Sequence, residues 1–243
     1  MMNELRPVGA ASRFAPVARN PGTPLNLDWF EDVQVNLSAA ERRVLLVQGE
    51  AQFAVAKSPA RPFVVRAGGV DVMEITLRHA AGLPAIEQVA KHVPQMHVGA
   101  GTVTRAEEMA RVQAAGATFA LSPGMTDALV QAAMQCKLPF MPGVMTPGEV
   151  MAARDYGFGL VKLFPAAQAG GLAMLKALAG PLGDMQFCPT GGVSLTNMGE
   201  FLKLPNVAMV GGSWLTPLDV VQRGDWAEIT RLAREASGIA NDL

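Results

Sequence analysis

Short apolar runs alternate with longer segments of helical spacing over residues 68–214. The apolar runs have the length and content of buried strands, and apolar residues recur every three or four positions in the segments between them. We expect strands at residues 70–77, 96–99, 119–122, 139–142, 159–164, 186–190 and 207–211. We expect helices at residues 83–92, 105–115, 126–137, 147–156, 171–179 and 196–203. Strands that alternate with helices in this way predict parallel βα units.

The fold class follows from the number and spacing of these units. Seven strands in a chain of 243 residues point to a parallel (β/α)8 TIM barrel in which one strand is still to be found. We expect residues 37–243 to form this single domain, with an irregular or divergent first βα unit. Residues 1–36 are rich in proline, asparagine and small side chains, so we expect a disordered N-terminal extension.

The missing strand should lie in the N-terminal part, where the pattern is weakest. Residues 37–46 have the spacing of a short helix, and the strand is either 44–47 or 62–66. Residues 47–66 are long enough for a strand and a helix, but Pro59 and Pro62 would interrupt the helix. One hypothesis is a pair of compensating frameshifts across this segment, and the alternative is a genuinely divergent unit.

Composition excludes several classes of protein. Twenty Lys and Arg residues balance 21 Asp and Glu residues, which argues against nonspecific nucleic-acid binding. No apolar run approaches the roughly 18 residues of a membrane-spanning helix, so we expect no membrane association. Cys136 and Cys188 form no C-x-x-C pair, which favours a reducing cytoplasm. His79, His92 and His97 lack metal-ligand spacing, so we expect no metal site.

Glycine and small polar residues gather where the expected strands end. Examples are G-A-G-T at residues 99–102, S-P-G at 122–124 and the two Gly-Gly pairs at 191–192 and 211–212. The carboxyl ends of barrel strands carry the active site, and phosphate commonly binds at the loops after the last two strands. The two Gly-Gly pairs therefore predict a phosphorylated substrate, whereas a single such cluster would be equally typical of a tight turn.

Two strands carry ionisable residues where apolar side chains would be ordinary. Period-two alternation places Glu74, Thr76 and Arg78 on the face that points into the barrel. Lys162 interrupts the apolar run G-L-V-K-L-F, on the same face as Leu160 and Phe164. A structural Glu–Arg pair and a lysine that reaches solvent are the simpler interpretations. The coincidence of Lys162 with an inward glutamate and an inward arginine favours a Schiff-base site.

Six motifs occur in one order along the chain: E-I-T-L-R (74–78), G-A-G-T (99–102), S-P-G (122–124), K-L-F-P-A (162–166), C-P-T-G-G (188–192) and G-G-S-W (211–214). Together they closely resemble the family of 2-dehydro-3-deoxy-phosphogluconate (KDPG) aldolase and 4-hydroxy-2-oxoglutarate (KHG) aldolase. The resemblance runs from about residue 67 to the C-terminus. It implies a class I aldolase on a (β/α)8 barrel, which usually assembles as a homotrimer and needs neither metal nor cofactor.

The resemblance also implies roles for residues at the keto-acid end of the substrate. Lys162 matches the lysine that forms an imine with the C2 carbonyl, and Glu74 matches the carboxylate that moves protons. Arg78 and Thr102 match residues that hold the carboxylate of the pyruvyl group. Phe164 lies where the family packs an aromatic ring against that group.

The other end of the substrate is assigned in the same way. Thr190 matches a threonine that contacts the hydroxyl region of the substrate. Gly191, Gly192, Gly212 and Ser213 match the residues that surround the phosphate.

The implied reaction cleaves KDPG to pyruvate and glyceraldehyde 3-phosphate in the Entner–Doudoroff pathway, with KHG as a second possible substrate. Thr76 and Arg78 side with the gluconate series, because galactonate-series relatives tend to have proline and asparagine there. One alternative is a catalytically impaired homologue that only binds phosphorylated acids. Another is a metal-dependent sugar-phosphate epimerase, which the lack of a His and Asp cluster disfavours.

Overall fold

The computed structural model of the protein describes residues 44–48 and 65–243. The expected extension, residues 1–36, lies outside the described residues, as does most of the segment to which the frameshift hypothesis applies. The expected helix at 37–46 is wrong over residues 44–46, which form a strand. The alternative strand at 62–66 is wrong over residues 65–66, which are helical, while residues 62–64 lie outside the described residues.

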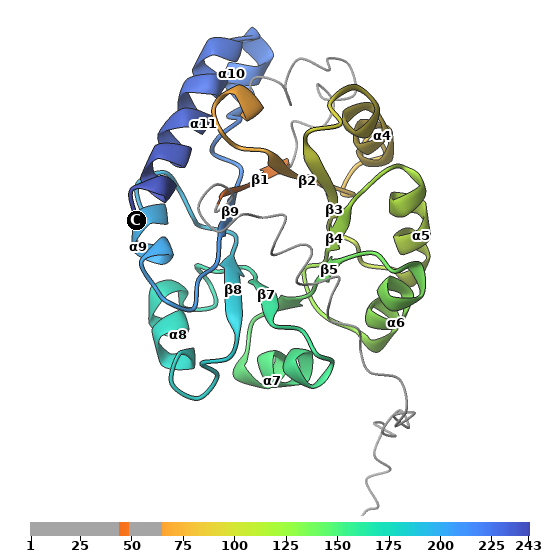
Figure 1. The fold of residues 1–243 in the computed structure, drawn as a ribbon, viewed down its shortest axis with the longest axis vertical. Helices are drawn as coiled ribbons and strands as arrows, with labels where there is room; N and C mark the ends of the chain where they lie inside the picture. The colour runs from red at the N-terminus through yellow and green to blue at the C-terminus, as the bar shows by residue number, and fades with distance from the viewer. Residues whose placement is uncertain (1–43, 49–64) are drawn as a thin grey trace, which may run out of the picture.

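Parallel strands form a ring that is seen end-on in Figure 1. They are β1 (Val44–Gln48), β2 (Val72–Thr76), β3 (His97–Gly101), β4 (Phe119–Leu121), β5 (Phe140–Met141), β6 (Gly143–Val144), β7 (Leu160–Leu163), β8 (Gln186–Pro189) and β9 (Val210–Gly212). β5 and β6 flank Pro142, which has no N–H to donate to a neighbouring strand. They therefore count as one interrupted strand, and all seven strands expected from the pattern are confirmed.

β1 is the strand that the pattern left unassigned between residues 44 and 66. It pairs in parallel with β2 on one side and with β9 on the other, with Leu46 opposite Met73 and Val44 opposite Val210. The expectation of a strand at 44–47 is thus confirmed.

Two isolated parallel bridges join β8 and the residue after it to β9 and the segment before it. They link Phe187 to Val207 and Thr190 to Gly211. The strands form a six-stranded sheet, β5-β4-β3-β2-β1-β9, and a three-stranded sheet, β6-β7-β8. These bridges on one side, and the chain through Pro142 on the other, join the two sheets into one ring.

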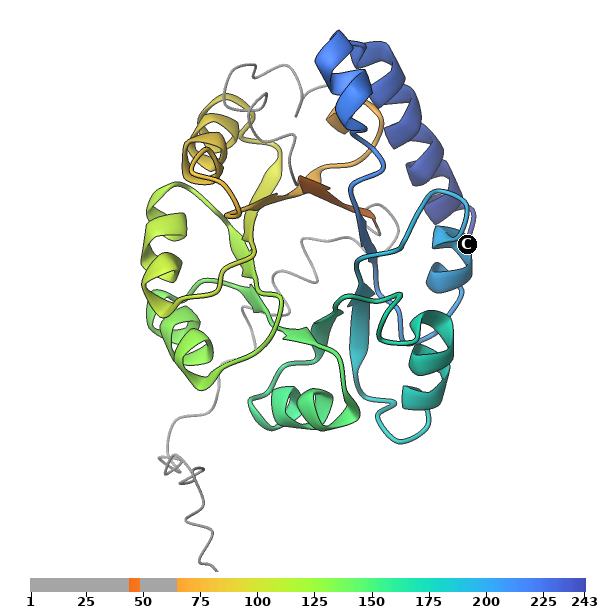
Figure 2. The same cartoon turned by 180° about the vertical axis from the view of Figure 1, so that it is seen from behind.

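Helices surround this ring on the outside (Figures 1 and 2). They are α4 (Gly82–His92), α5 (Ala106–Ala114), α6 (Asp127–Cys136), α7 (Pro147–Asp155), α8 (Gly171–Leu178), α9 (Met198–Leu202), α10 (Leu218–Arg223) and α11 (Trp226–Asn241). The six expected helices are confirmed, whereas α10 and α11 were not anticipated. α11 packs on the barrel through one face, where Ile229, Ala233, Ala236 and Ala240 are buried.

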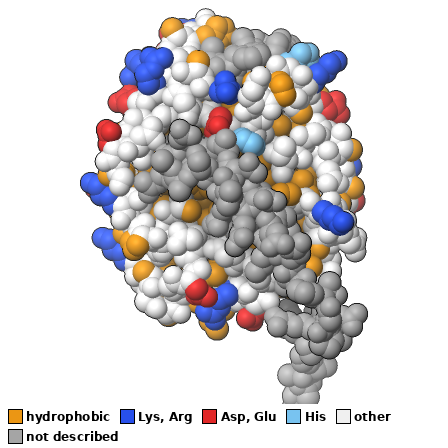
Figure 3. Space-filling model, in the orientation of Figure 1, with side chains coloured by type: hydrophobic (Ala, Val, Ile, Leu, Met, Phe, Trp, Pro, Cys, Tyr) orange, Lys and Arg blue, Asp and Glu red, His pale blue; other side chains and the backbone are white. Residues whose placement is uncertain are grey.

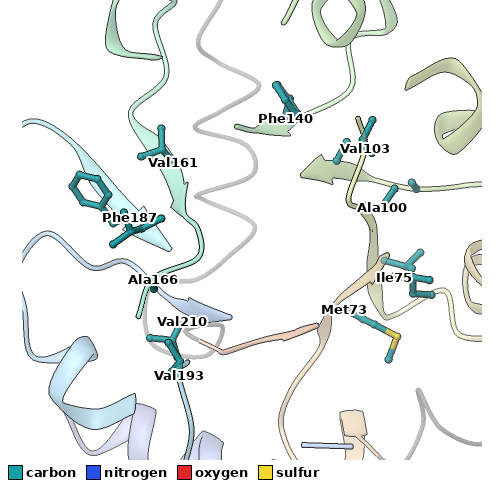
Figure 4. Close-up of a cluster of buried hydrophobic side chains, with 14 of the residues drawn as sticks. Met73, Ile75, Ala100, Val103, Phe140, Val161, Ala166, Phe187, Val193 and Val210 are labelled. Atoms are coloured by element: carbon teal, nitrogen blue, oxygen red, sulfur yellow. The ribbon is translucent and has the colours of Figure 1, made fainter. Parts of the chain in front are cut away.

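Neighbouring residues of β2, β4, β7 and β8 enter two separate apolar layers. Met73, Ile75, Val161 and Phe187 point outward and pack between the strands and the helices (Figure 4). The second layer fills the barrel interior and consists of Val72, Leu121, Leu160, Cys188 and Met209. The expected alternation of β2 and β7 is confirmed, and the inner layer forms a floor beneath the polar residues of the two strands.

The outer surface agrees with the balanced charge of the sequence. Lys and Arg side chains are scattered among Asp and Glu side chains on the face shown in Figure 3. Within the described residues, no helix is long and apolar enough to cross a membrane.

The outer layer gives a stability prediction. Phe187 is fully buried, so Phe187→Ala should lower the free energy of unfolding by about 3–5 kcal/mol, through lost apolar burial and the cavity left behind. Urea denaturation measures this change. The control is Met134→Ala, since Met134 is 43% exposed on α6 and the change should cost less than about 1 kcal/mol. Equal losses in the two variants would contradict the assignment of Phe187 to the core.

Candidate active site

A buried ion pair lies across the barrel above the apolar floor. Lys162 of β7 places its Nζ 2.9 Å from Oε1 and 3.1 Å from Oε2 of Glu74, on β2. Lys162 is 4% exposed and Glu74 is fully buried. Both side chains point inward, as the alternation predicted. The structural Glu–Arg pair that was the simpler interpretation is not formed, because Glu74 contacts Lys162 instead.

The ion pair has the composition of an acid–base unit. Water is largely excluded, so the attraction between the ammonium and the carboxylate is stronger than at the surface. A carboxyl group and an amine in direct contact are placed for the proton transfers of general acid–base chemistry. The Nζ also lies 5.3 Å from the centre of the Phe164 ring, within cation–π range.

Arg78 and Thr102 lie at the mouth of the barrel, each just beyond the end of its strand. Arg78 is exposed, and its Nε donates a 3.3 Å hydrogen bond to Oγ1 of Thr76, which is buried. Thr102 is half-buried and has a φ of 57°. A threonine rarely adopts this left-handed conformation, and such residues concentrate at functional sites.

Thr190 directly follows β8 at the mouth of the barrel. It is buried, and its Oγ1 lies 3.4 Å from the carbonyl oxygen and 3.7 Å from the Sγ of Cys188. Thr190 also bridges to Gly211 of β9. This bridge brings the two Gly-Gly pairs of the sequence to adjacent strand ends.

The loop after β8 has a backbone that only glycine adopts easily. Gly191 and Gly192 have φ values of 91° and 85°. The Nδ2 of Asn197 donates to the carbonyl of Gly192 at 3.1 Å and so fixes the loop. Asn197 is not among the site residues predicted from the sequence, although asparagine is a typical turn-stabilising residue.

The loop after β9 lies beside it. A Cβ at Gly212 would collide with the ring of Trp214, while Ser213 is exposed at the strand end. The four residues predicted to surround a phosphate, Gly191, Gly192, Gly212 and Ser213, thus lie on two neighbouring loops. Among the described residues, no group of three or more His, Cys, Asp or Glu side chains is arranged to hold a metal ion.

Comparison with known proteins agrees with this geometry. The model of the "KDPG and KHG aldolase" family matches residues 46–232. The chain belongs to this aldolase family. KDPG aldolase of Dickeya dadantii is 44% identical over 209 residues, which cover 86% of this chain and 96% of that protein.

Solved structures of other family members are similar over most of their length. KDPG aldolase of Legionella pneumophila, in which pyruvate was captured as a covalent carbinolamine, has a TM-score of 0.74 at 40% identity and covers 80% of this chain and 94% of its own. The Zymomonas mobilis aldolase with 3-phosphoglycerate has a TM-score of 0.75 at 37% identity and covers 84% of this chain and 95% of its own. The expected family and fold class are therefore confirmed.

Cys188 gives a prediction about pH. Burial raises the pKa of this thiol to about 12, whereas the pKa of a cysteine thiol in an unfolded chain is about 8.5. The folded state therefore loses stability relative to the unfolded state as the pH rises above that lower value. Relative to Cys188→Ala, the free energy of unfolding should fall by about 2 kcal/mol between about pH 7 and pH 10. Urea denaturation of both proteins across this range measures it.

Alkylation provides the matching control. Cys136 is half-buried and Cys188 is buried, so iodoacetamide should modify Cys136 in the native protein and Cys188 only after unfolding. Equal rates in a mass-spectrometric time course would contradict the buried, protonated state of Cys188.

Proposed function

We propose that this protein is a class I aldolase that cleaves KDPG to pyruvate and glyceraldehyde 3-phosphate. The observation that carries the proposal is the contact of Lys162 Nζ with both oxygens of Glu74 inside the barrel. An amine beside a base can form an imine, and an imine accepts the electron pair released when the adjacent carbon–carbon bond breaks. The carbinolamine captured in the Legionella relative supports this type of chemistry.

The first half of the mechanism forms the imine. Glu74 takes a proton from Lys162, and the neutral Nζ attacks the C2 carbonyl of the substrate. Glu74 returns a proton to the carbonyl oxygen, which gives the carbinolamine. Glu74 then takes a second proton from Nζ and delivers it to the carbinolamine hydroxyl, which leaves as water. The pair ends as a protonated imine on Lys162 and a carboxylate on Glu74, within hydrogen-bond reach of the reacting atoms.

The second half breaks the carbon–carbon bond. Glu74 accepts the proton of the C4 hydroxyl, the C3–C4 bond breaks, and its electron pair moves to the imine nitrogen to give an enamine. Glyceraldehyde 3-phosphate leaves, and Glu74 protonates C3. Water then hydrolyses the imine of pyruvate and frees Lys162. The water released earlier balances the water consumed here, so no cofactor enters the reaction.

The remaining site residues orient the substrate. Arg78 and Thr102 bind the carboxylate at the barrel mouth, and Phe164 packs against the pyruvyl group beside Lys162. Thr190 contacts the hydroxyl region from the end of β8, the strand next to β7. The backbone of Gly191, Gly192 and Gly212, together with the Ser213 hydroxyl, holds the phosphate, and the 3-phosphoglycerate of the Zymomonas structure supports such a subsite.

The observations favour an active enzyme over an impaired homologue that only binds phosphorylated acids. That alternative depended on a damaged first βα unit. β1 lies in the ring between β2 and β9, and the Lys162–Glu74 contact is formed. KHG is a second substrate in this proposal, because its cleavage uses the same imine.

The proposal includes a cytoplasmic homotrimer. Its support is the family resemblance and, for the reducing compartment, the two free cysteines.

The imine gives the first prediction about activity. Sodium borohydride with pyruvate should add one pyruvyl group to the wild-type protein at Lys162, and Lys162→Ala should lose both this labelling and the cleavage of KDPG. Mass spectrometry and a coupled lactate dehydrogenase assay measure the two effects. Lys176→Ala is the matched control, since Lys176 is exposed on α8 and its loss should change neither result. Labelling that persists in Lys162→Ala would overturn the proposed function.

Ser213 gives the second prediction about activity. Ser213→Ala should raise the KM for KDPG by about tenfold or more, because a hydrogen bond to a charged group contributes about 1.5–3 kcal/mol. The KM for KHG, which has no phosphate, should stay within about twofold of the wild type. Steady-state assays on both substrates measure this, and a similar loss on both would remove Ser213 from the phosphate subsite.

A further inference from the structure

Gly101 is the last residue of β3 and lies next to the Glu74 side chain. A Cβ built at Gly101 would overlap Oε1, Cγ and Cδ of Glu74, and these are the three nearest heavy atoms. Gly101 does not belong to the glycines with a positive φ, so its backbone accepts an L-residue without strain. A larger residue at position 101 is therefore excluded by the Glu74 side chain and not by backbone conformation.

The missing side chain at Gly101 determines where the Glu74 carboxylate can lie. Glu74 is fully buried and starts from β2, the strand next to β3, with Thr76 opposite Gly101 in the pairing. Its side chain must lean over β3 while its two oxygens stay 2.9 and 3.1 Å from Lys162 Nζ. A methyl group at Gly101 would force the carboxylate out of this position. Because hydrogen bonds weaken steeply with distance and angle, the displaced oxygens would lose at least part of the contact.

We propose that Gly101 is a positioning residue, whose missing side chain forms the recess that holds the Glu74 carboxylate against Lys162. This inference rests on the proposed function, in which Glu74 moves every proton. General acid–base catalysis requires the base within hydrogen-bond reach of its partner, and displacements of about 1 Å can cost about a hundredfold in rate. Gly101 thus acts through Glu74 and has no contact of its own with the reacting atoms.

The test is a double-mutant cycle between Gly101→Ala and Glu74→Ala. Two quantities are measured for each protein: the rate of borohydride trapping of pyruvate and the midpoint of urea unfolding. Gly101→Ala alone should slow trapping by about tenfold to a hundredfold, toward the rate of Glu74→Ala. In the Glu74→Ala background, which empties the recess, the same change should alter trapping by less than about twofold and leave the midpoint unchanged.

Gly99→Ala is the matched control, because Gly99 lies on the same face of β3, two residues earlier. A Cβ there would overlap the ring of Phe119 and not Glu74. It should lower the unfolding midpoint equally with and without Glu74, and its effect should add to that of Glu74→Ala. A trapping rate close to that of the wild type is expected for this variant.

The outcomes separate the inference from the proposed function. If pyruvate is not trapped at Lys162 in the wild type, the proposed function fails, while the stability cycle still tests the recess. If the wild type is trapped but Gly101→Ala reacts at the wild-type rate, or if its effects add to those of Glu74→Ala, the inference about Gly101 is overturned.

Two failures of folding are also informative. A Gly101→Ala chain that folds only together with Glu74→Ala supports the recess, whereas failure of both overturns it. If Glu74→Ala does not fold alone, the stability cycle is run in Lys162→Met, which removes the ammonium that would otherwise be left unpaired. The same criteria apply there, and independence of the two changes contradicts the inference.

Discussion

The buried pair of Lys162 and Glu74 is the interaction on which the rest of the site depends. Two opposite charges removed from water are tolerated only when each has a close partner, and loss of one partner would leave the other uncompensated. The 2.9 Å contact joins strands β7 and β2, which are 88 residues apart in sequence. The apolar floor excludes water beneath the pair, and the space at Gly101 leaves room for the Glu74 carboxylate.

Closure of the barrel makes the pair possible. β2 lies in the larger sheet and β7 in the smaller one, so their side chains face each other only when both sheets curve around one interior. β1 contributes by pairing with β2 and β9, and the bridges between β8 and the β9 side complete the circuit. The site therefore forms only in the complete barrel, because its residues come from different βα units.

Glycine has two distinct functions at the mouth. Gly191 and Gly192 supply left-handed backbone where a loop turns beside the proposed phosphate subsite. Gly101 and Gly211 instead supply space, the first for Glu74 and the second for the Thr190 side chain. The high glycine content of the chain reflects both needs, and the second becomes apparent only when the neighbouring strand is in place.

Local pattern determined much of this protein. Apolar periodicity predicted seven strands and six helices, because a buried face requires apolar residues at the repeat of the strand or helix. The alternation within β2 and β7 was enough to predict that Glu74 and Lys162 point inward. The tertiary structure decided what depends on residues distant in sequence: that 44–48 is a strand, that Glu74 contacts Lys162 and not Arg78, and that Gly101 makes room for it. Periodicity fixes the face of a side chain, whereas its partner is fixed by the closed ring.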